Sequence, residues 1–468
     1  MTATFDLVII GAGPAGMSAA IAATRHGLST LVLDEQPEPG GQIYRAIERQ
    51  AGTAHARRLG ADYASGASLI ERFRSCSAAY WPATQVWQIE PDLRVLASRA
   101  GVSLTVAARS ILIAVGATER PVPIAGWTLP GVMTVGAGQI LLKASAVVPP
   151  GPLWIAGQGP LPLLYAAQLV DAGMPPAGLL DTTPKGALAR GWRHLPGAVA
   201  NGRYLARGLG YLARIMRAGV PYLRHVTEVS AQGDNRLTSI RYRRAGREHE
   251  VEASTLLLHE GVVPHVHMTL SVKAQHRWDP ALQAPCPVLD PWGESSFPGL
   301  FVAGDAGGIG GAAVAAIRGT RAALRVAHRL GRMGEEELRD LGAATERQLR
   351  SHEQIRPFLN AVFAPRKDIH LPVDDVIVCR CEEVTSRQIR MAVEAGCLGP
   401  NQVKAFTRCG MGPCQGRQCA LTMVQIIADH RGVPVETLDQ LSVRPPLKPL
   451  TLGELASLTP EEAGPHHP

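Results

Sequence analysis

The 468-residue sequence has no apolar run long enough to cross a membrane. A spanning helix needs about 18 or more predominantly apolar residues, and every apolar stretch here is interrupted sooner by Gly, Pro or a charged residue. The chain also lacks clusters of Lys and Arg interleaved with aromatic residues, which make up only 5% of it. Its formal net charge of +7 therefore gives no support to nucleic-acid binding. The first strand-like run begins at Phe5, which leaves no room for a cleaved signal peptide.

Cysteine is almost absent before residue 379, where only Cys76 and Cys286 occur. No Cys-x-x-Cys or Cys-x4-Cys pair is present in that part of the chain, so dithiol chemistry of the thioredoxin-reductase kind has no residues to carry it. The remaining cysteines crowd together at Cys379, Cys381, Cys397, Cys409, Cys414 and Cys419. In a chain without a secretory signal, this crowding favours a metal or redox centre over a disulfide framework.

The chain opens with a strand–turn–helix–strand pattern. The apolar run Leu7–Ile10 leads into the glycine-rich turn at 11–16, and a helix-like stretch follows from Met17 to about His26. The next apolar run, Thr30–Leu33, ends at the acidic pair Asp34-Glu35. Short apolar runs closed by turn residues predict buried strands, so this segment has the pattern of a βαβ unit.

Each glycine in Gly11-Ala12-Gly13-Pro14-Ala15-Gly16 meets a geometric requirement for holding a pyrophosphate. Gly11 permits a tight turn, Gly13 lets the backbone approach the phosphates, and Gly16 lets the helix pack closely on the strand. The N-terminus of the following helix presents unpaired N–H groups and the positive end of its dipole to the same phosphates. Asp34 follows where an acidic side chain can bond ribose hydroxyls. The combination is a specific signal for a dinucleotide site.

A second unit of the same kind follows, with a degraded glycine turn. Leu153–Ala156 is strand-like, a helix-like stretch covers Leu163–Ala172, and the next strand ends at Asp181. In the turn that begins Gly157-Gln158-Gly159, the third glycine position is Pro162. Proline fits a first helical turn, but it has no N–H and its ring fills the space that glycine leaves for close packing. We therefore expect a dinucleotide fold without a working NAD(P) site.

Further motifs make the first unit resemble the FAD domain of the pyridine-nucleotide-disulfide oxidoreductase superfamily. They are Pro39–Gln42, Ile113–Ala117 and Phe301–Ala306. The resemblance implies that the nucleotide is FAD and that Asp305 lies against its ribityl and phosphate groups. A glycine-rich stretch, 307–311, then opens a helix beneath the flavin. The expected FAD-binding residues are Gly11, Gly13, Pro14, Ala15, Gly16, Asp34, Glu35, Gly41, Gln42, Ala114, Gly116, Gly304 and Asp305.

The C-terminal cysteines have the spacing of a cluster site. One residue separates Cys379 from Cys381, and four separate Cys414 from Cys419. Thiolates are the ligands that iron–sulfur clusters prefer, and four of them complete a 2Fe–2S centre. The spacing leaves two questions open: Cys409 precedes Cys414 at the same interval at which Cys419 follows it, and tetrahedral thiolate sites also hold zinc.

Helices are expected around these cysteines. Thr385-Ser386-Arg387-Gln388 has the pattern of a capping box, and helix-like stretches cover 389–395, 401–406 and 420–430. The last stretch begins directly after Cys419. We therefore predict a small helical domain whose loops offer N–H groups to an anionic cluster.

The cysteine layout, together with the tract Thr407–Cys414, resembles the bacterioferritin-associated-ferredoxin-like (BFD-like) 2Fe–2S domain that is fused to amino- and imino-acid dehydrogenase subunits. Over nearly its whole length, the chain is similar to the α (A) subunits of hetero-oligomeric FAD-dependent dehydrogenases. These are the α subunits of opine oxidase, D-hydroxyproline dehydrogenase and dye-linked L-proline dehydrogenase, together with the B subunit of hydrogen cyanide synthase. The resemblance implies a 2Fe–2S cluster held by Cys379, Cys381, Cys414 and Cys419.

The family resemblance also implies an electron-transfer role for the chain. An opine or a D-hydroxyproline-like secondary amine or imino acid is then oxidised mainly on an FAD-containing β subunit of amino-acid-oxidase type. The resemblance also implies an external electron acceptor and, in addition to the β subunit, a small γ subunit. Some relatives hold FMN at a subunit interface or ATP in the second nucleotide domain, which these residues do not themselves predict.

The two expected cofactors suit that role, because a flavin takes up two electrons and releases them singly, while a 2Fe–2S cluster carries one at a time. No residue stands out as a catalytic base. The alternatives are a self-sufficient NAD(P)H-dependent flavin reductase, a subunit of hydrogen cyanide synthase that acts on glycine, and a non-catalytic scaffold with a zinc-bound tail.

The predicted fold class is α/β, with two Rossmann-like dinucleotide-binding domains of the pyridine-nucleotide-disulfide oxidoreductase type and a small α-helical BFD-like domain. The FAD domain is expected at 1–118 and 255–333, on either side of a degenerate NAD(P)-type domain at 119–254. A helical arm at 334–371 leads to the 2Fe–2S domain at 372–432, and 433–468 is a C-terminal extension. We expect a cytoplasmic protein that meets a membrane, if at all, through its electron acceptor.

Overall fold

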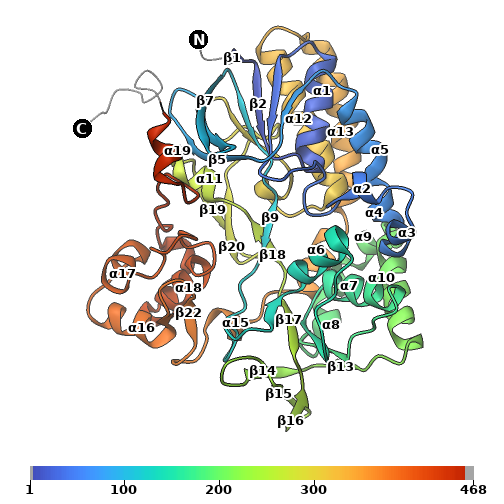
Figure 1. Ribbon diagram of the computed structural model, residues 1–468, viewed down its shortest axis with the longest axis vertical. Helices are drawn as coiled ribbons and strands as arrows, with labels where there is room; N and C mark the ends of the chain where they lie inside the picture. The colour runs from blue at the N-terminus through green and yellow to red at the C-terminus, as the bar shows by residue number, and fades with distance from the viewer. Residues whose placement is uncertain (1–3, 459–468) are drawn as a thin grey trace.

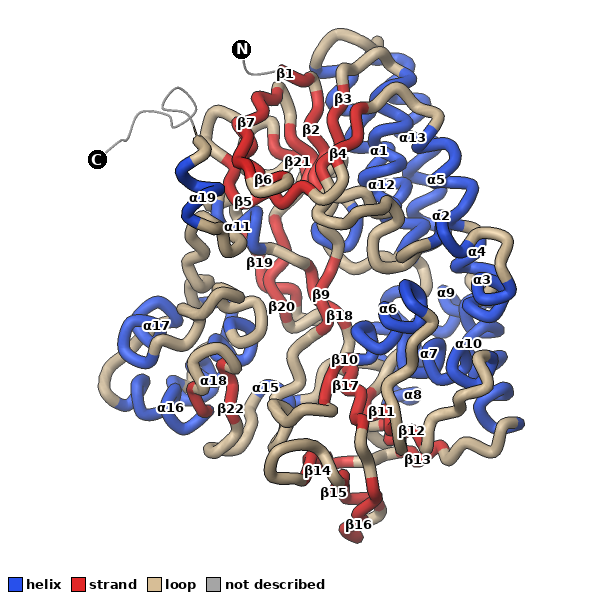
Figure 2. The backbone as a smooth tube through the Cα atoms, in the orientation of Figure 1, coloured by secondary structure: helices blue, strands red, loops and turns tan. Residues whose placement is uncertain are grey.

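The computed structural model describes residues 4–458. Two α/β units are stacked along the long axis, and a small, mainly helical unit lies beside them (Figure 1). Figure 2 shows the strands of the two units as separate groups, with most of the helices on one side of the molecule. This arrangement confirms the predicted fold class. Within the described residues, none of the helices is both long and apolar enough to cross a membrane.

The first unit is formed by segments from both ends of the chain. Its strands are β1 (Thr4–Phe5), β2 (Leu7–Ile10), β3 (Thr30–Leu33), β4 (Ala79–Trp81), β5 (Thr84–Ile89), β6 (Arg94–Arg99), β7 (Val102–Ala108), β8 (Ile111–Ile113), β19 (His276–Asp279), β20 (Ala284–Pro287) and β21 (Leu300–Val302). Its helices are α1 (Pro14–Arg25), α2 (Ile47–Gln50), α3 (Ala54–Leu59), α4 (Ala61–Ala64), α5 (Gly66–Arg74), α11 (His267–Ser271) and α12 (Ala312–Arg329).

A parallel five-stranded sheet with the order β21-β8-β2-β3-β4 forms the centre of this unit. Its inner strands are short apolar runs that are buried on both faces, which is typical of parallel sheets. In β2, Leu7 and Ile9 pack with α1 and α12, whereas Val8 and Ile10 pack with β5, β6 and β7. The carboxyl ends of these strands therefore meet at one edge between two apolar layers.

The second unit contains the degraded glycine turn. Its strands are β10 (Val132–Thr134), β11 (Leu153–Gly157), β12 (Gly178–Asp181), β13 (Tyr222–Arg224), β14 (Thr227–Gln232), β15 (Ser239–Arg244), β16 (Arg247–Glu252) and β17 (Thr255–His259). Its helices are α6 (Val135–Ser145), α7 (Pro160–Asp171), α8 (Ala187–Gly191), α9 (Leu195–Ala200) and α10 (Gly202–Arg217). The antiparallel pair β9 (Ala117–Glu119) and β18 (Val262–Pro264) connects it to the first unit.

The main sheet of the second unit has the order β10-β17-β11-β12-β13. Strand β17 lies at its interior, with Leu153 opposite Thr255 and Gly157 opposite His259. The second unit therefore extends through His259, past the expected boundary at residue 254. A buried strand that follows a hairpin has the same local pattern in either unit, and its pairing with β10 and β11 places it here.

The small unit follows a helical arm. The arm is α13 (Glu335–Glu353), α14 (Arg356–Val362) and α15 (Lys367–His370), and the small unit is β22 (Ile377–Cys379), β23 (Val384–Thr385), α16 (Ser386–Glu394), α17 (Pro400–Thr407) and α18 (Ala420–Arg431). The expected capping box is present, because the Thr385 hydroxyl accepts the Gln388 N–H and the Gln388 side chain accepts the Thr385 N–H.

The C-terminal extension returns to the first unit. Val443 and Leu447 are buried in the layer between the two sheets of that unit, and the Leu447 N–H donates to the Trp87 carbonyl. Helix α19 (Leu452–Ala456) then lies beside β7, where the Ser103 N–H donates to the Ser457 hydroxyl. The extension therefore holds the small unit and the first unit together.

Candidate cofactor cavity and cysteine cluster

A cavity of about 430 Å³ lies at the carboxyl edge of the first sheet. Ligand pockets commonly have volumes of about 300–1,000 Å³. The structure brings every predicted FAD-binding residue except Gly16 to the wall of this cavity. Gly16 instead lies behind the turn, where an added Cβ would come within 1.9 Å of the Gly11 carbonyl oxygen. This position matches the packing role expected for the third glycine.

The glycine turn has the shape that a phosphate site needs. Gly11 has a φ of +106°, a conformation that favours glycine. The loop containing Gly41, with a φ of +59°, approaches so closely that an added Cβ would lie 3.0 Å from the Gly13 Cα. Helix α1 begins at Pro14, so its free N–H groups face the same cavity. Substitution of either loop glycine would narrow the space available to a pyrophosphate.

The two acidic residues at the end of β3 have different partners. Asp34 is buried and accepts hydrogen bonds from the backbone N–H groups of Ala12 and Gln36, and burial raises the pKa of its carboxyl group. Glu35 is more exposed, and its carboxylate lies 2.7 Å from the Lys448 ammonium group. Asp34 therefore stabilises the glycine turn, while Glu35 stays at the cavity mouth.

Lys448 was not among the predicted site residues. It belongs to the C-terminal extension and lines the cavity from the opposite end of the sequence. No local pattern around it identifies a nucleotide contact, since its position depends on the burial of Leu447 next to it.

Asp305 organises the other side of the cavity. Its Oδ1 accepts hydrogen bonds from the N–H groups of Gly310 and Gly311, at 2.8 and 3.0 Å, immediately before α12 begins. The preceding Gly304 has a φ of +72° and also lines the cavity. The carboxylate therefore shapes the loop from which α12 starts.

A buried lysine forms part of the cavity wall and was also missed. The Lys143 ammonium group donates to the Gln42 carbonyl at 3.2 Å and to the Gln139 side-chain oxygen at 3.0 Å. Burial, with a smaller contribution from the positive charge of Arg45, lowers the pKa of Lys143 to about 7. Lys143 is a polar residue on a largely apolar helix, and its sequence position gives no sign of this contact.

The second glycine turn is occupied by protein groups. The buried Glu260 carboxylate accepts hydrogen bonds from the Gln158 amide at 3.0 Å, the Thr182 hydroxyl at 2.8 Å and the Arg366 guanidinium at 2.7 Å. Arg366 comes from the helical arm, and a cavity of about 220 Å³ remains beside Glu260. This cavity is also lined by Arg120 and Arg356, and the Glu260 carboxylate is paired with Arg366.

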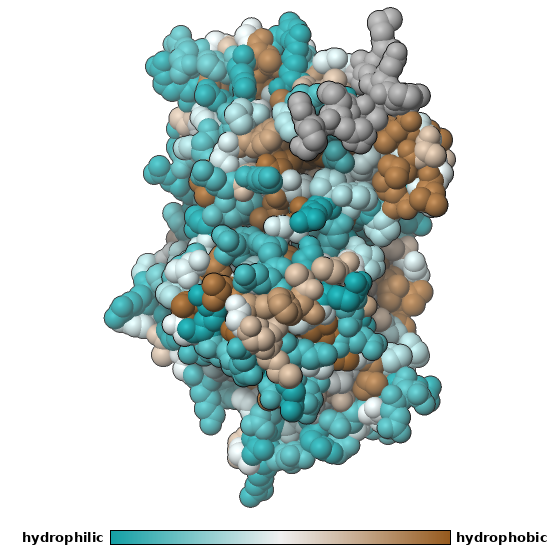
Figure 3. All heavy atoms as spheres, turned by 90° about the vertical axis from the view of Figure 1, so that its left-hand side faces the viewer, coloured by the Kyte–Doolittle hydropathy of each residue, from teal (hydrophilic) through white to brown (hydrophobic). Residues whose placement is uncertain are grey.

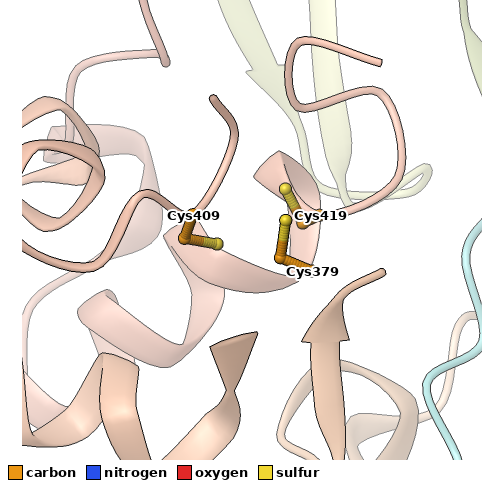
Figure 4. Close-up of side chains that lie close together, drawn as sticks. All are labelled: Cys379, Cys409 and Cys419. Carbon is orange, nitrogen blue, oxygen red and sulfur yellow. The ribbon is translucent and has the colours of Figure 1, made fainter. Parts of the chain in front are cut away.

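The C-terminal cysteines gather in two neighbouring groups. The Sγ atoms of Cys379, Cys409 and Cys419 lie within 4.8 Å of one another, and all three residues are buried. Figure 4 shows the Cys379 and Cys419 side chains next to each other, with the Cys409 sulfur pointing toward the pair. The second group is Cys381 and Cys414, whose side chains interact with each other.

The surroundings of Cys379 suit a thiolate, whereas the pKa values of Cys409 and Cys419 are raised, chiefly by their interactions with Cys379. Hydrogen bonds from the Cys409 and Cys419 thiols, and then from the Gly410 and Glu382 N–H groups, lower the pKa of Cys379 to about 2. Backbone N–H groups directed at sulfur atoms are the donors that stabilise anionic clusters. The donor set therefore fits a thiolate-bound metal centre, and iron and zinc both meet that description.

The structure brings the predicted ligands Cys379 and Cys419 together and puts Cys381 beside Cys414. It adds Cys409, the residue that the spacing had left as an alternative, to the first group. Cys397 lies in the core of the small unit but is not part of the three-cysteine group, and Cys76 and Cys286 lie in the first unit.

The chain matches two family models. Residues 5–185 match the pyridine nucleotide-disulphide oxidoreductase family, and residues 376–458 match the sarcosine oxidase A3 domain. The solved structure of L-proline dehydrogenase from P. horikoshii superposes with a TM-score of 0.72 at 18% identity, covering 97% of this chain and 80% of that one. At this identity the likeness concerns the fold.

Sequence relatives are more similar. The A subunit of opine oxidase from Rhizobium meliloti (strain 1021) is 43% identical over 456 residues, which cover 97% of this chain and 99% of the relative. A hydrogen cyanide synthase subunit of Pseudomonas aeruginosa is 34% identical over 431 residues, covering 88% of this chain and 90% of that one.

The fold and the glycine-turn cavity define a flavoprotein oxidoreductase with two dinucleotide-binding folds. The full-length matches identify it more closely: the chain belongs to the family that includes the A subunits of opine oxidases. FAD is therefore its flavin, as predicted, and the cavity is lined by the residues expected to contact it. Membership of this family also makes the chain one subunit of a larger flavin-dependent enzyme.

Proposed function

We propose that this chain is the electron-transfer subunit of a multisubunit dehydrogenase or oxidase that acts on CH–NH donors. The proposed substrate is an opine or a related secondary amine or imino acid, and it is oxidised mainly on a partner β subunit. The observation that carries this proposal is the presence of two candidate redox sites, the FAD cavity and the buried thiol group, in one chain.

In the proposed FAD site, the N–H groups at Gly13 and the start of α1 bind the pyrophosphate. Asp34 and Glu35 would hold the adenosine ribose, and Asp305 would hold the ribityl chain. FAD supplies two-electron uptake and one-electron release when bound. The protein contributes a pre-shaped glycine turn, a helix N-terminus and a largely apolar wall.

The proposed 2Fe–2S ligands are Cys379, Cys381, Cys414 and Cys419. Cys379 and Cys419 lie together, and Cys381 and Cys414 come from the same two chain segments as the first group. Cys409 is the rival for one of the four places. Iron is preferred to zinc here because one-electron chemistry gives the neighbouring flavin an exit route, whereas zinc has no redox chemistry.

A partner subunit is supported by apolar side chains that remain on the surface. Figure 3 views the molecule from the side of the small unit and shows apolar groups among a mainly hydrophilic surface. In that unit Phe406 is 74% exposed and Leu398 60% exposed, and in the second unit Trp192 is 66% exposed. Exposed apolar groups of this kind mark contact surfaces when they gather into patches. We assign the partner the β-subunit role, with FAD of its own.

The substrate class rests on the relatives. The greater identity to the A subunit of opine oxidase than to the hydrogen cyanide synthase subunit favours an opine over glycine. A self-sufficient NAD(P)H-dependent reductase is disfavoured, because the second glycine turn faces Glu260 and its partner Arg366. Neither FMN nor ATP is needed by the proposal.

The direct experiment compares the isolated chain with the co-expressed complex. Both preparations are analysed for flavin and iron, and dye reduction is followed with a panel of opines, imino acids, glycine and NAD(P)H. We expect flavin and iron in the isolated chain, and turnover of an opine or imino acid only in the complex. Substrate turnover by the isolated chain at the rate of the complex would move substrate oxidation onto this chain, and NAD(P)H turnover would establish the reductase instead.

A further inference from the structure

A histidine pair occupies the seam between the FAD cavity and the small unit. His265 follows strand β18, and His267 begins helix α11, which belongs to the first unit. A narrow cavity of about 70 Å³ lies at this seam, lined on one side by the histidines and on the other by Gln415 and Arg417 of the small unit. The pair is not part of either motif that defines the two candidate redox sites.

His265 faces both sites. Its side chain lines the FAD cavity and also the seam cavity, and its backbone N–H donates to the Gly116 carbonyl in the cavity wall. The imidazole is partly buried; its Nε2 atom is shielded from solvent and has no hydrogen-bond partner within the described chain. A buried imidazole nitrogen without a partner is costly, so a packing role alone does not explain a histidine here.

His267 continues the contact toward the cysteines. The centroids of the two imidazole rings are 5.6 Å apart. The His267 Nε2 lies 3.1 Å from the carbonyl oxygen of Gln415, the residue that directly follows Cys414. Gln415 has a φ of +48°, and its side-chain amide also donates to the Pro446 carbonyl. The FAD cavity is thus connected to a proposed cluster ligand through two rings, one hydrogen bond and the backbone of Gln415.

Both imidazoles are neutral at ordinary pH. Burial is the main cause that lowers the pKa of His265 to about 4 and that of His267 to about 3. Neutral rings need no counter-ion at the seam, and they do not change charge when an electron passes. This is the behaviour expected of a static medium between two redox groups rather than of a proton carrier.

We infer that His265 and His267 form the electron-transfer bridge between the FAD cavity and the cysteine cluster. This inference rests on the proposed function. In each passage the reduced flavin loses one electron and the oxidised cluster gains one. An external one-electron acceptor reoxidises the cluster between passages, so two passages return the flavin to its oxidised form and release its protons to solvent. The histidines are positioning residues, which set the contact between the two groups and are not themselves oxidised.

The test measures internal electron transfer in the holo-complex without substrate. The flavin is reduced anaerobically by a light flash with a deazaflavin donor, and the loss of cluster absorbance is followed in time. His267→Phe keeps a buried ring and removes the hydrogen bond to Gln415, and His265→Leu removes the ring that faces the FAD cavity. We expect the transfer rate constant to fall about tenfold in each variant, equivalent to about 1.4 kcal/mol in activation free energy.

His276→Phe is the matched control. His276 is another partly buried imidazole whose pKa is lowered by burial, and its nitrogens contact the Thr269 hydroxyl and the Ala274 carbonyl. It lies close in sequence to the pair but lines neither the FAD cavity nor the seam cavity. We expect its transfer rate to match the unsubstituted complex. His267→Gln, which can still donate to the Gln415 carbonyl, should recover part of the lost rate.

Several outcomes are decisive. Unchanged transfer rates in His265→Leu and His267→Phe, with flavin and iron fully retained, would overturn the bridge. If His267→Phe loses iron, His267→Gln and His265→Leu decide the question. An equal loss of transfer rate in His276→Phe would also overturn the proposed bridge, because the loss would then come from a general destabilisation of the first unit. An unsubstituted complex without iron, or with a cluster that reduced flavin does not reduce, would instead refute the proposed function.

Discussion

Asp305→Ala is expected to weaken FAD binding markedly. The Asp305 carboxylate accepts the N–H groups of Gly310 and Gly311 and lines the cavity wall. Its removal leaves those donors unmet and takes away the polar group that we assign to the ribityl chain. Leaving a partner group unsatisfied costs about 1–3 kcal/mol, which corresponds to an FAD dissociation constant about 5- to 150-fold higher.

The measurement is titration of the deflavinated protein with FAD, followed by the quenching of flavin fluorescence. Asp305→Asn is a useful second variant, because its amide oxygen can still accept both N–H groups at the position of Oδ1. We therefore expect it to bind FAD more tightly than the alanine variant. Asp290→Ala is the matched control. Asp290 accepts the N–H groups of Trp292 and Glu294, both at 2.8 Å, in an exposed loop away from the cavity.

The control separates loop stability from cofactor contact. Both alanine variants lose a carboxylate that organises a loop, so both are expected to lower the melting temperature of the apoprotein slightly. Only Asp305→Ala should change the FAD dissociation constant. Equal FAD affinity in Asp305→Ala and the unsubstituted protein would refute the role assigned to this carboxylate, even if the loop itself became less stable.

Further predictions concern the cluster, the C-terminal contact, the arm and acid stability. Cys414→Ser is expected to abolish iron binding and to leave FAD bound, and stoichiometric iron in the variant would contradict the ligand assignment. Lys448→Ala should raise the FAD dissociation constant by no more than about fivefold, because a solvent-accessible ion pair contributes about 0–1 kcal/mol; fluorescence titration measures this. Glu260→Gln removes the charge of one partner of a buried ion pair with Arg366. Such losses cost about 3–5 kcal/mol. We expect the free energy of unfolding in urea to fall by about 3 kcal/mol, the lower end of this range, because Arg366 keeps Asp368 as a second carboxylate partner. Burial, with smaller contributions from neighbouring arginines, lowers the pKa of His370 to about 3. Below about pH 6.5, the His370 imidazole therefore takes up a proton in the unfolded chain but not in the folded chain. Stability should therefore fall as pH decreases from 6.5 toward 3, and His370→Gln should reduce this dependence in melting experiments.

Much of the local structure could be predicted from the sequence, because it depends on neighbouring residues. Helix α18 begins at Ala420, as expected, and the capping box at Thr385 has both of its predicted hydrogen bonds. The expected strand at Thr30–Leu33 has the same bounds in the structure. In each case a short motif satisfies its own backbone groups, so no distant contact is needed to specify it.

Contacts between distant segments could not be predicted in this way. Strand β17 was assigned to the wrong unit, since an apolar run of this length fits either sheet and its partner is 102 residues away at the Leu153–Thr255 pairing. Lys143 reaches the cavity wall from α6, and its hydrogen bond to Gln42 spans 101 positions. The local sequence of β17 is that of an ordinary buried strand, and the local sequence around Lys143 is that of an ordinary helix.

The sequence by itself determined the redox character of this protein. The glycine turn ending at Gly16 and the cysteine spacing that includes Cys414 are local requirements of phosphate and metal binding, so they can be recognised without the fold. Tertiary structure decided which groups share a site. It brought Lys448 to the mouth of the FAD cavity, added Cys409 to the thiol group and seated His267 against the loop after Cys414. These contacts arise from the packing of separate apolar layers, and a linear pattern carries no information on which surfaces will meet.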